Sequence, residues 1–166
     1  MLHRALSHPE ELGVYVRIMF FDFSSAFNTI QPTILKYKLT EMGVDPACVS
    51  WIADYLTGRP QFVRLGNCVS GTLMSSTGAL QGTVLAPFLF TLYTSDFRYS
   101  TEPCHRQKYS DDTAIVACIR NGQEAEYRDL IRALSDWSHK NCPHFNTSKT
   151  KEMVIDPVDP NPLFSQ

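Results

Sequence analysis

The chain has 166 residues, an apolar content of 43% and a formal net charge of −2. This length is typical of one domain, and the apolar content excludes an intrinsically disordered chain. No apolar run approaches the ~20 residues that span a bilayer, so we expect no membrane partner. The charge supplies no basic excess for neutralising phosphates, although a cluster of catalytic carboxylates would itself make a chain acidic.

The five cysteines show no C-x-x-C spacing. An odd number without a ligand or disulfide pattern predicts reduced thiols and an intracellular protein, nuclear or cytoplasmic. The first ten residues lack a basic segment that leads into an apolar one, so we expect no secretory signal. His139, Cys142 and His144 lie close in sequence, but without a fourth ligand at a familiar spacing no zinc site is expected.

The first predicted element is a buried strand over residues 14–21, which is apolar, rich in β-forming residues and runs directly into Asp22. A helix is expected from Pro32 onward. The next helix is better delimited, because Asp45 can cap its first turn and Gly58 can end it.

The middle of the chain predicts a hairpin, a loop and a helix. Residues 61–77 contain short β-forming runs that turn at Gly66–Asn67. Residues 78–82 form a loop bracketed by glycines. Residues 84–99 predict a largely apolar helix that tolerates Pro87 in its first turn.

The last part of the chain predicts two short strands over residues 107–118, then a helix and a final strand over residues 151–155. Asn121 and Glu124 have the spacing of a capping box for this helix. Its apolar side is formed by Tyr127, Leu130, Ile131, Leu134 and Trp137. The mixed order of elements predicts an α+β fold rather than a doubly wound sheet.

Three carboxylates, Asp22, Asp111 and Asp112, lie where predicted strands end. A carboxylate in this position is held by the sheet and faces a cleft. Such groups can hold two Mg²⁺ ions ~3.5–4 Å apart for nucleotidyl transfer. By itself this signal is weak, because Asp-Asp pairs are common in turns.

Four segments, in chain order, resemble motifs A to D of reverse transcriptases. They are FFDFSSAFNTI at residues 20–30, GALQGTVLAP at residues 78–87, KYSDD at residues 108–112 and NTSKTK at residues 146–151. The resemblance covers residues 14–156, and its first and last segments are similar to the LINE-like elements of non-LTR retrotransposons. It implies a palm with an antiparallel sheet and packed helices over residues 1–156, followed by a loose C-terminal tail over residues 157–166.

The resemblance also implies catalytic roles for individual residues. Asp22 and Asp111 match the two metal-binding aspartates, and Asp112 matches the third acidic position, which we include among the metal ligands. Lys149 matches the motif D lysine, a candidate proton donor to pyrophosphate. A solvated surface charge is the alternative explanation for this lysine.

Four further positions match the family's nucleotide pocket. The backbone of Phe23 matches the segment that approaches the metal and triphosphate. Phe27 matches the aromatic gate that excludes a ribose 2′-OH, and Gln81 and Gly82 match the turn that lines the pocket and touches the template. Phe27 as a core residue and Gly82 as an ordinary turn glycine are the structural alternatives.

Two departures from the family pattern stand out. Leu80 occupies the usual proline position of motif B, which removes a constraint on the turn that presents Gln81. Only residues 1–13 precede motif A and residues 157–166 follow motif D, so the resemblance implies a fragment without fingers and thumb. We expect such a chain to be inactive or weakly active by itself.

The sequence therefore predicts the palm of an RNA-directed DNA polymerase that uses two Mg²⁺ ions, with Mn²⁺ as a substitute. The implied partners are an RNA template, a DNA primer and dNTPs. A catalytically inactive remnant that acts as an interaction module is the alternative, and Leu80 favours it. An unrelated Mg²⁺ phosphohydrolase ranks last, because it predicts neither an aromatic gate nor a motif B turn.

Overall fold

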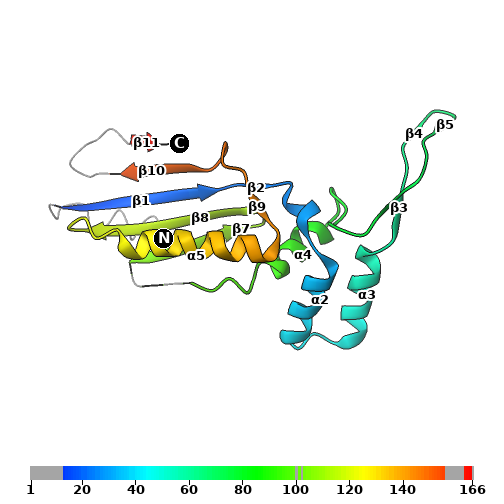
Figure 1. Cartoon of the computed structure of the whole chain (residues 1–166), viewed down its shortest axis with the longest axis horizontal. Helices are drawn as coiled ribbons and strands as arrows, with labels where there is room; N and C mark the ends of the chain where they lie inside the picture. Colours follow the sequence, from blue (N-terminus) through cyan, green and yellow to red (C-terminus); the bar gives the residue numbers. More distant parts are fainter. Residues whose placement is uncertain (1–12, 100, 102, 156–162, 166) are drawn as a thin grey trace. The chain divides into compact units, whose positions relative to one another are not determined.

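The computed structural model describes residues 13–99, 101, 103–155 and 163–165 (Figure 1). These residues form two compact units. Ser25–Asp96 is the helical unit, and the described residues on either side of it form the sheet unit. None of the described helices is long and apolar enough to cross a membrane.

The sheet unit is built on five antiparallel strands in the order β11-β10-β1-β8-β7. Their bounds are β1 Val14–Phe21, β7 Cys104–Tyr109, β8 Asp112–Arg120, β10 Lys151–Ile155 and β11 Leu163–Ser165. The predicted strand over residues 14–21 is confirmed and lies at the centre of this sheet. It is apolar on both sides because both of its faces are packed: Ile18 is buried on one and Phe21 on the other.

Helix α5 (Ala125–Asn141) packs on one face of this sheet (Figure 1). Its predicted apolar side is confirmed, with Tyr127, Leu130 and Leu134 buried against the strands. The predicted capping box is wrong. Glu124 itself is the N-cap residue and makes no capping hydrogen bond, while Asn121 adopts a left-handed turn with φ 52°.

A polar network explains why Glu124 does not cap the helix. The Arg17 guanidinium on β1 lies 2.9 Å from Glu124 Oε1 and 2.8 Å from Glu152 Oε1 on β10. The Tyr15 and Tyr127 hydroxyls donate to these same two carboxylates, each at 2.6 Å. Burial and the Glu152 carboxylate raise the pKa of Tyr127. The network therefore ties α5 to both strands through charge-assisted hydrogen bonds.

The prediction of a loose tail over residues 157–166 is wrong for residues 163–165, which form a strand. Leu163–Ser165 form β11, which pairs with β10 so that Ser165 lies opposite Glu152. The edge of β10 offers unpaired backbone donors and acceptors, and a returning segment satisfies them. Residues 156–162 and 166 lie outside the described residues.

The helical unit contains η1 (Ala26–Thr29), α2 (Pro32–Glu41), α3 (Pro46–Leu56) and α4 (Leu85–Tyr93). The predicted cap of α3 is confirmed, because the Asp45 carboxylate accepts from Ala47 N at 2.9 Å and Cys48 N at 3.4 Å. Helix α4 ends well before the predicted limit at residue 99. The hydroxyls of Thr94 and Ser95 bond back to carbonyls of the last turn and compete with its continuation.

A two-stranded arm extends from the end of α3 (Figure 1). Its outer part pairs β4 (Arg64–Leu65) with β5 (Cys68–Val69), and its base pairs β3 (Arg59–Gln61) with β6 (Leu73–Ser75). Leu65 lies opposite Cys68, so the predicted turn at Gly66–Asn67 is confirmed.

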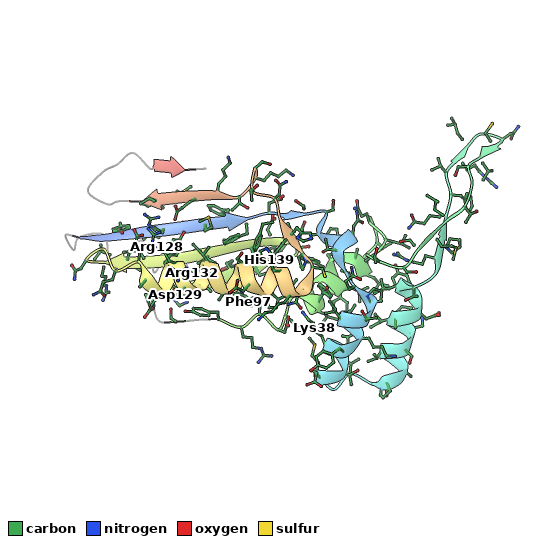
Figure 2. The ribbon with its side chains drawn as sticks, in the orientation of Figure 1. Lys38, Phe97, Arg128, Asp129, Arg132 and His139 are labelled. Atoms are coloured by element: carbon green, nitrogen blue, oxygen red, sulfur yellow. The ribbon has the colours of Figure 1, made fainter. Side chains whose placement is uncertain are left out.

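Lys38 joins α2 to the end of α4 inside the helical unit (Figure 2). Its side chain is 7% exposed, and Nζ donates to the Tyr93 carbonyl at 2.6 Å and to Asp96 Oδ1 at 2.8 Å. Burial lowers the pKa of Lys38, and the Asp96 carboxylate opposes this shift. The ion pair is thus a polar contact between α2 and the end of α4.

We expect Lys38→Met to lower the free energy of unfolding by about 1–3 kcal/mol, because it leaves the buried Tyr93 carbonyl without this donor. The matched control is Lys36→Met, which removes an exposed charge on the same helix and should change stability by less than about 0.5 kcal/mol. Urea denaturation of both variants measures the difference. Equal losses of unfolding free energy in the two variants would show that the Lys38 ion pair does not stabilise the fold.

Candidate active site

The three carboxylates predicted from the sequence lie at one end of the sheet. Strand β1 ends at Phe21, which pairs with Thr113 of β8. Asp22 comes directly after this pair on β1, and Asp112 comes directly before it on β8. The two aspartates therefore lie beside each other. Asp111 occupies the turn between β7 and β8, where Tyr109 pairs with Asp112. The register thus brings together residues that are far apart in the sequence.

The turn of this hairpin is strained. Ser110 has φ 55°, a left-handed conformation that a residue with a Cβ seldom adopts. Two-residue hairpin turns require such angles to match the twist of their strands. The β7–β8 pairing therefore imposes a tight turn that presents Asp111 at the end of the sheet. Strained backbone of this kind is concentrated at functional sites.

Motif D is attached to Asp22 through its backbone. The Asn146 amide donates to the Asp22 carbonyl at 2.8 Å, and the Lys149 amide donates to the Asn146 carbonyl at 3.1 Å. This turn places Lys149 Nζ 3.9 Å from Asp22 Oδ2. The side chains of Lys149 and Asp22 are 68% and 33% exposed, so both remain accessible to a ligand.

An aromatic contact supports the same junction. Strand β2 (Phe23–Ser24) pairs with β9 (His144–Phe145), and the rings of Phe23 and Phe145 stack with centroids 5.0 Å apart. Phe23 is 6% exposed. Its ring is therefore a core group, and only its backbone is available for the predicted approach to a triphosphate.

The carboxylates suit a hard divalent cation. Among the described residues, no three His, Cys, Asp or Glu side chains form a ready metal cage. Mg²⁺ does not need one, because it usually binds one or two protein carboxylates and takes its remaining oxygens from water and substrate phosphates. Asp22, with Asp111 or Asp112, supplies a donor set of that kind.

The residues of motifs A and B that are predicted to line a nucleotide pocket lie together in the helical unit. Phe27 is half-buried, and its ring makes a T-shaped contact with the ring of Phe90, with centroids 5.8 Å apart. The amide of Ala79 donates to the Phe27 carbonyl at 2.8 Å. Gln81 Nε2 donates to Asn28 Oδ1 at 3.3 Å. Gly82 has φ +80° and open space where a Cβ would stand, so a ligand can approach its backbone.

The motif B loop is held by groups that the sequence analysis did not assign to it. The Arg59 guanidinium donates to the Thr77 and Gly78 carbonyls at 2.6 and 2.7 Å. The Thr83 hydroxyl donates to the carbonyl of Leu80 at 2.7 Å. These contacts restrain the turn at the position where the family proline is missing. No local pattern marks Arg59, because the contact depends on how the arm folds back toward the loop.

Gly78 is required for the approach of motif B to motif A. Its φ is +71°, and a Cβ there would lie 2.7 Å from Asn28 Cα and 3.0 Å from the Phe27 carbonyl oxygen. Both neighbours are backbone atoms that a side-chain rotation cannot move.

We therefore expect Gly78→Ala to destabilise the chain by more than the ~1–2 kcal/mol cost of a left-handed residue. Gly71→Ala is the control, because a Cβ at Gly71 meets nothing within 4 Å. Thermal or urea unfolding of the two variants measures the contrast. If both variants unfold like the wild type, the close approach of the two motifs is not a structural constraint.

With this geometry in place, comparison with known proteins identifies the class. Residues 4–161 match the model of the family "Reverse transcriptase (RNA-dependent DNA polymerase)". The chain therefore belongs to the reverse transcriptase family. The resemblance to LINE-like elements and the predicted α+β palm fold are both confirmed.

Curated relatives come from mobile elements. The chain is 26% identical over 167 residues to the RNA-directed DNA polymerase from mobile element jockey of Drosophila funebris, covering 93% of this chain and 18% of that protein. It is 24% identical over 147 residues to the probable RNA-directed DNA polymerase from transposon X-element of Drosophila melanogaster, covering 85% and 16%. The chain thus spans less than a fifth of the length of these relatives.

Solved structures with the same fold include telomerases from Candida tropicalis. One, in complex with a fragment of telomeric RNA, has a TM-score of 0.67 at 11% identity and covers 92% of this chain and 28% of its own. An apo form truncated from its C-terminal domain also has a TM-score of 0.67, at 12% identity, with 99% and 33% covered. These likenesses concern the fold alone.

Proposed function

We propose that this chain is the catalytic palm of an RNA-directed DNA polymerase that extends a DNA primer on an RNA template with dNTPs. The observation that carries the proposal is the β1–β8 register. It aligns Asp22 with the Asp111–Asp112 turn at one end of the sheet, with Lys149 3.9 Å from Asp22. Family membership supports the reaction class, and the mobile-element relatives support the choice of template and product.

In this proposal Asp22 and Asp111 hold two Mg²⁺ ions, with Asp112 beside them. When bound, the ions neutralise the triphosphate and stabilise the attacking and leaving oxygens. The sheet supplies the rigidity that keeps the carboxylates in place, because their backbones belong to paired strand ends. Lys149, whose Nζ lies 3.9 Å from Asp22 Oδ2, is the proposed proton donor to the departing pyrophosphate.

The helical unit supplies the nucleotide pocket. Phe27 is braced by Phe90 and by the backbone of Ala79, so its ring is restrained rather than free. A restrained ring beneath the sugar would exclude a 2′-OH by overlap. Gln81 and Gly82 lie on an exposed loop whose amide groups and open backbone can contact the base pair being formed.

The first test is metal binding by the 166-residue chain. Mn²⁺ is the probe, because carboxylate sites for Mg²⁺ also accept it and its paramagnetism broadens nearby NMR signals. We expect broadening centred on Asp22 and the Asp111–Asp112 turn. Asp22→Asn and Asp111→Asn should each weaken Mn²⁺ binding by at least about tenfold, since even outer-shell changes cost ~10–100-fold.

Asp129→Asn is the matched control. This carboxylate is exposed on α5 and pairs with Arg132 at 2.7 Å (Figure 2). Its replacement should leave Mn²⁺ affinity unchanged. Equal affinity in all four proteins would remove the metal-site assignment and favour the inactive-remnant alternative.

The second test concerns Phe27 and sugar selection. In a chimera of the jockey polymerase that carries residues 4–161 in place of its matching segment, Phe27→Val should raise ribonucleotide over deoxynucleotide incorporation by on the order of tenfold or more. Single-nucleotide primer extension with competing dNTP and rNTP measures this ratio. Phe62→Val on the arm removes a different exposed ring and should leave the ratio unchanged. An unchanged ratio in the Phe27 variant would assign that ring to packing alone.

A further inference from the structure

Phe20 is an exposed aromatic residue on the central strand of the sheet. It is 43% exposed, whereas its neighbours Phe21 and Ile18 are 6% and 5% exposed. Phe21 packs on the α5 side of the sheet, and consecutive strand residues point to opposite faces. Phe20 therefore lies on the face opposite α5, with its ring accessible to a ligand.

Phe20 belongs to a row of side chains that crosses four strands. It pairs with Lys151 of β10 on one side and with Ala114 of β8 on the other, and Ala114 pairs with Gln107 of β7. Direct partners in a sheet share a face. We call Lys151, Phe20, Ala114 and Gln107 the transverse row.

The row has the composition of a surface for a nucleotide strand. Its centre is an aromatic ring beside a small residue, which leaves room for a flat group above Ala114. One end carries the positive charge of Lys151, which makes no ion pair among the described residues, and the other carries the exposed amide of Gln107. Aromatic rings beside cations are the features that bind nucleic-acid strands without sequence preference.

The transverse row also lies close to the carboxylates. Asp112 is two residues along β8 from Ala114, and Asp22 is two residues beyond Phe20. At the strand rise, this separation is roughly 7 Å. A row so close to the site of attack can contact the nucleotide that carries the attacking oxygen.

We propose that the transverse row binds the 3′-terminal nucleotide of the primer, with Phe20 packed against its base or sugar and Lys151 near its phosphate. The inference rests on the proposed function, because only a polymerase places a primer end at these carboxylates. It adds a primer-positioning residue, Phe20, to the residues that hold metal and dNTP.

The test is photocrosslinking with the 166-residue chain, Mg²⁺ and an RNA–DNA hybrid whose dideoxy-terminated primer carries 4-thiothymidine as its last base. We expect a crosslink to the peptide that contains Phe20. Phe20→Ala should reduce its yield by about 5–150-fold, which corresponds to the loss of one stacked base. Phe20→Tyr retains the ring and should retain the crosslink. Tyr37→Ala, at a 66% exposed aromatic residue on α2, is the matched control and should have no effect.

Three results would overturn the proposal: no crosslink with the wild-type chain, a yield that does not depend on Phe20, or crosslinking only when the thio base is in the template strand. The Mn²⁺ titration of the same variants separates this failure from failure of the proposed function. If Phe20 is unimportant but Asp22→Asn and Asp111→Asn still weaken Mn²⁺ binding, the metal site stands and only the primer contact is lost. If the metal site fails, those aspartate variants bind Mn²⁺ like the wild type.

Discussion

The antiparallel pairing of β1 with β8 is the constraint on which the candidate site depends. Because Phe21 pairs with Thr113, the pairing brings Asp22 beside Asp112. A slip of one residue would move Ile115 off the face that packs against α5 and would separate the two carboxylate-bearing strand ends. Burial on both faces opposes such a slip. The Arg17 network adds directional contacts that link β1, β10 and α5 in one arrangement.

Motif A contributes to both units of the chain. Its first part, Asp22 and Phe23, is held in the sheet unit by the Asn146 amide and the Phe145 ring. Its second part, Phe27 and Asn28, is held in the helical unit by the motif B loop. Each half is thus restrained by a partner distant in sequence. The carboxylate at Asp22 and the proposed pocket residue Phe27 are therefore each held in place within their own unit.

Elements with strong local signals were predictable from the sequence. The strand before Asp22, the cap at Asp45 and the turn at Gly66–Asn67 each depend on neighbours in the chain, and all are confirmed. The predictions that were wrong concern elements whose ends are set by side-chain contacts. Glu124 was expected to serve a capping box, but its carboxylate pairs with Arg17 of β1 and with Arg128 of α5. Helix α4 stops early because the Thr94 and Ser95 hydroxyls bond to its last turn.

By itself, the sequence determined the types of the main elements and, through four ordered motifs, the family and the candidate site residues. Those conclusions rest on periodicity and residue identity, which are local properties. Only the tertiary structure decided that Arg59 braces the motif B loop and that Phe20, Ala114 and Lys151 form one row. Strand register and side-chain exposure follow from burial summed over residues far apart in the chain, so no short segment contains them.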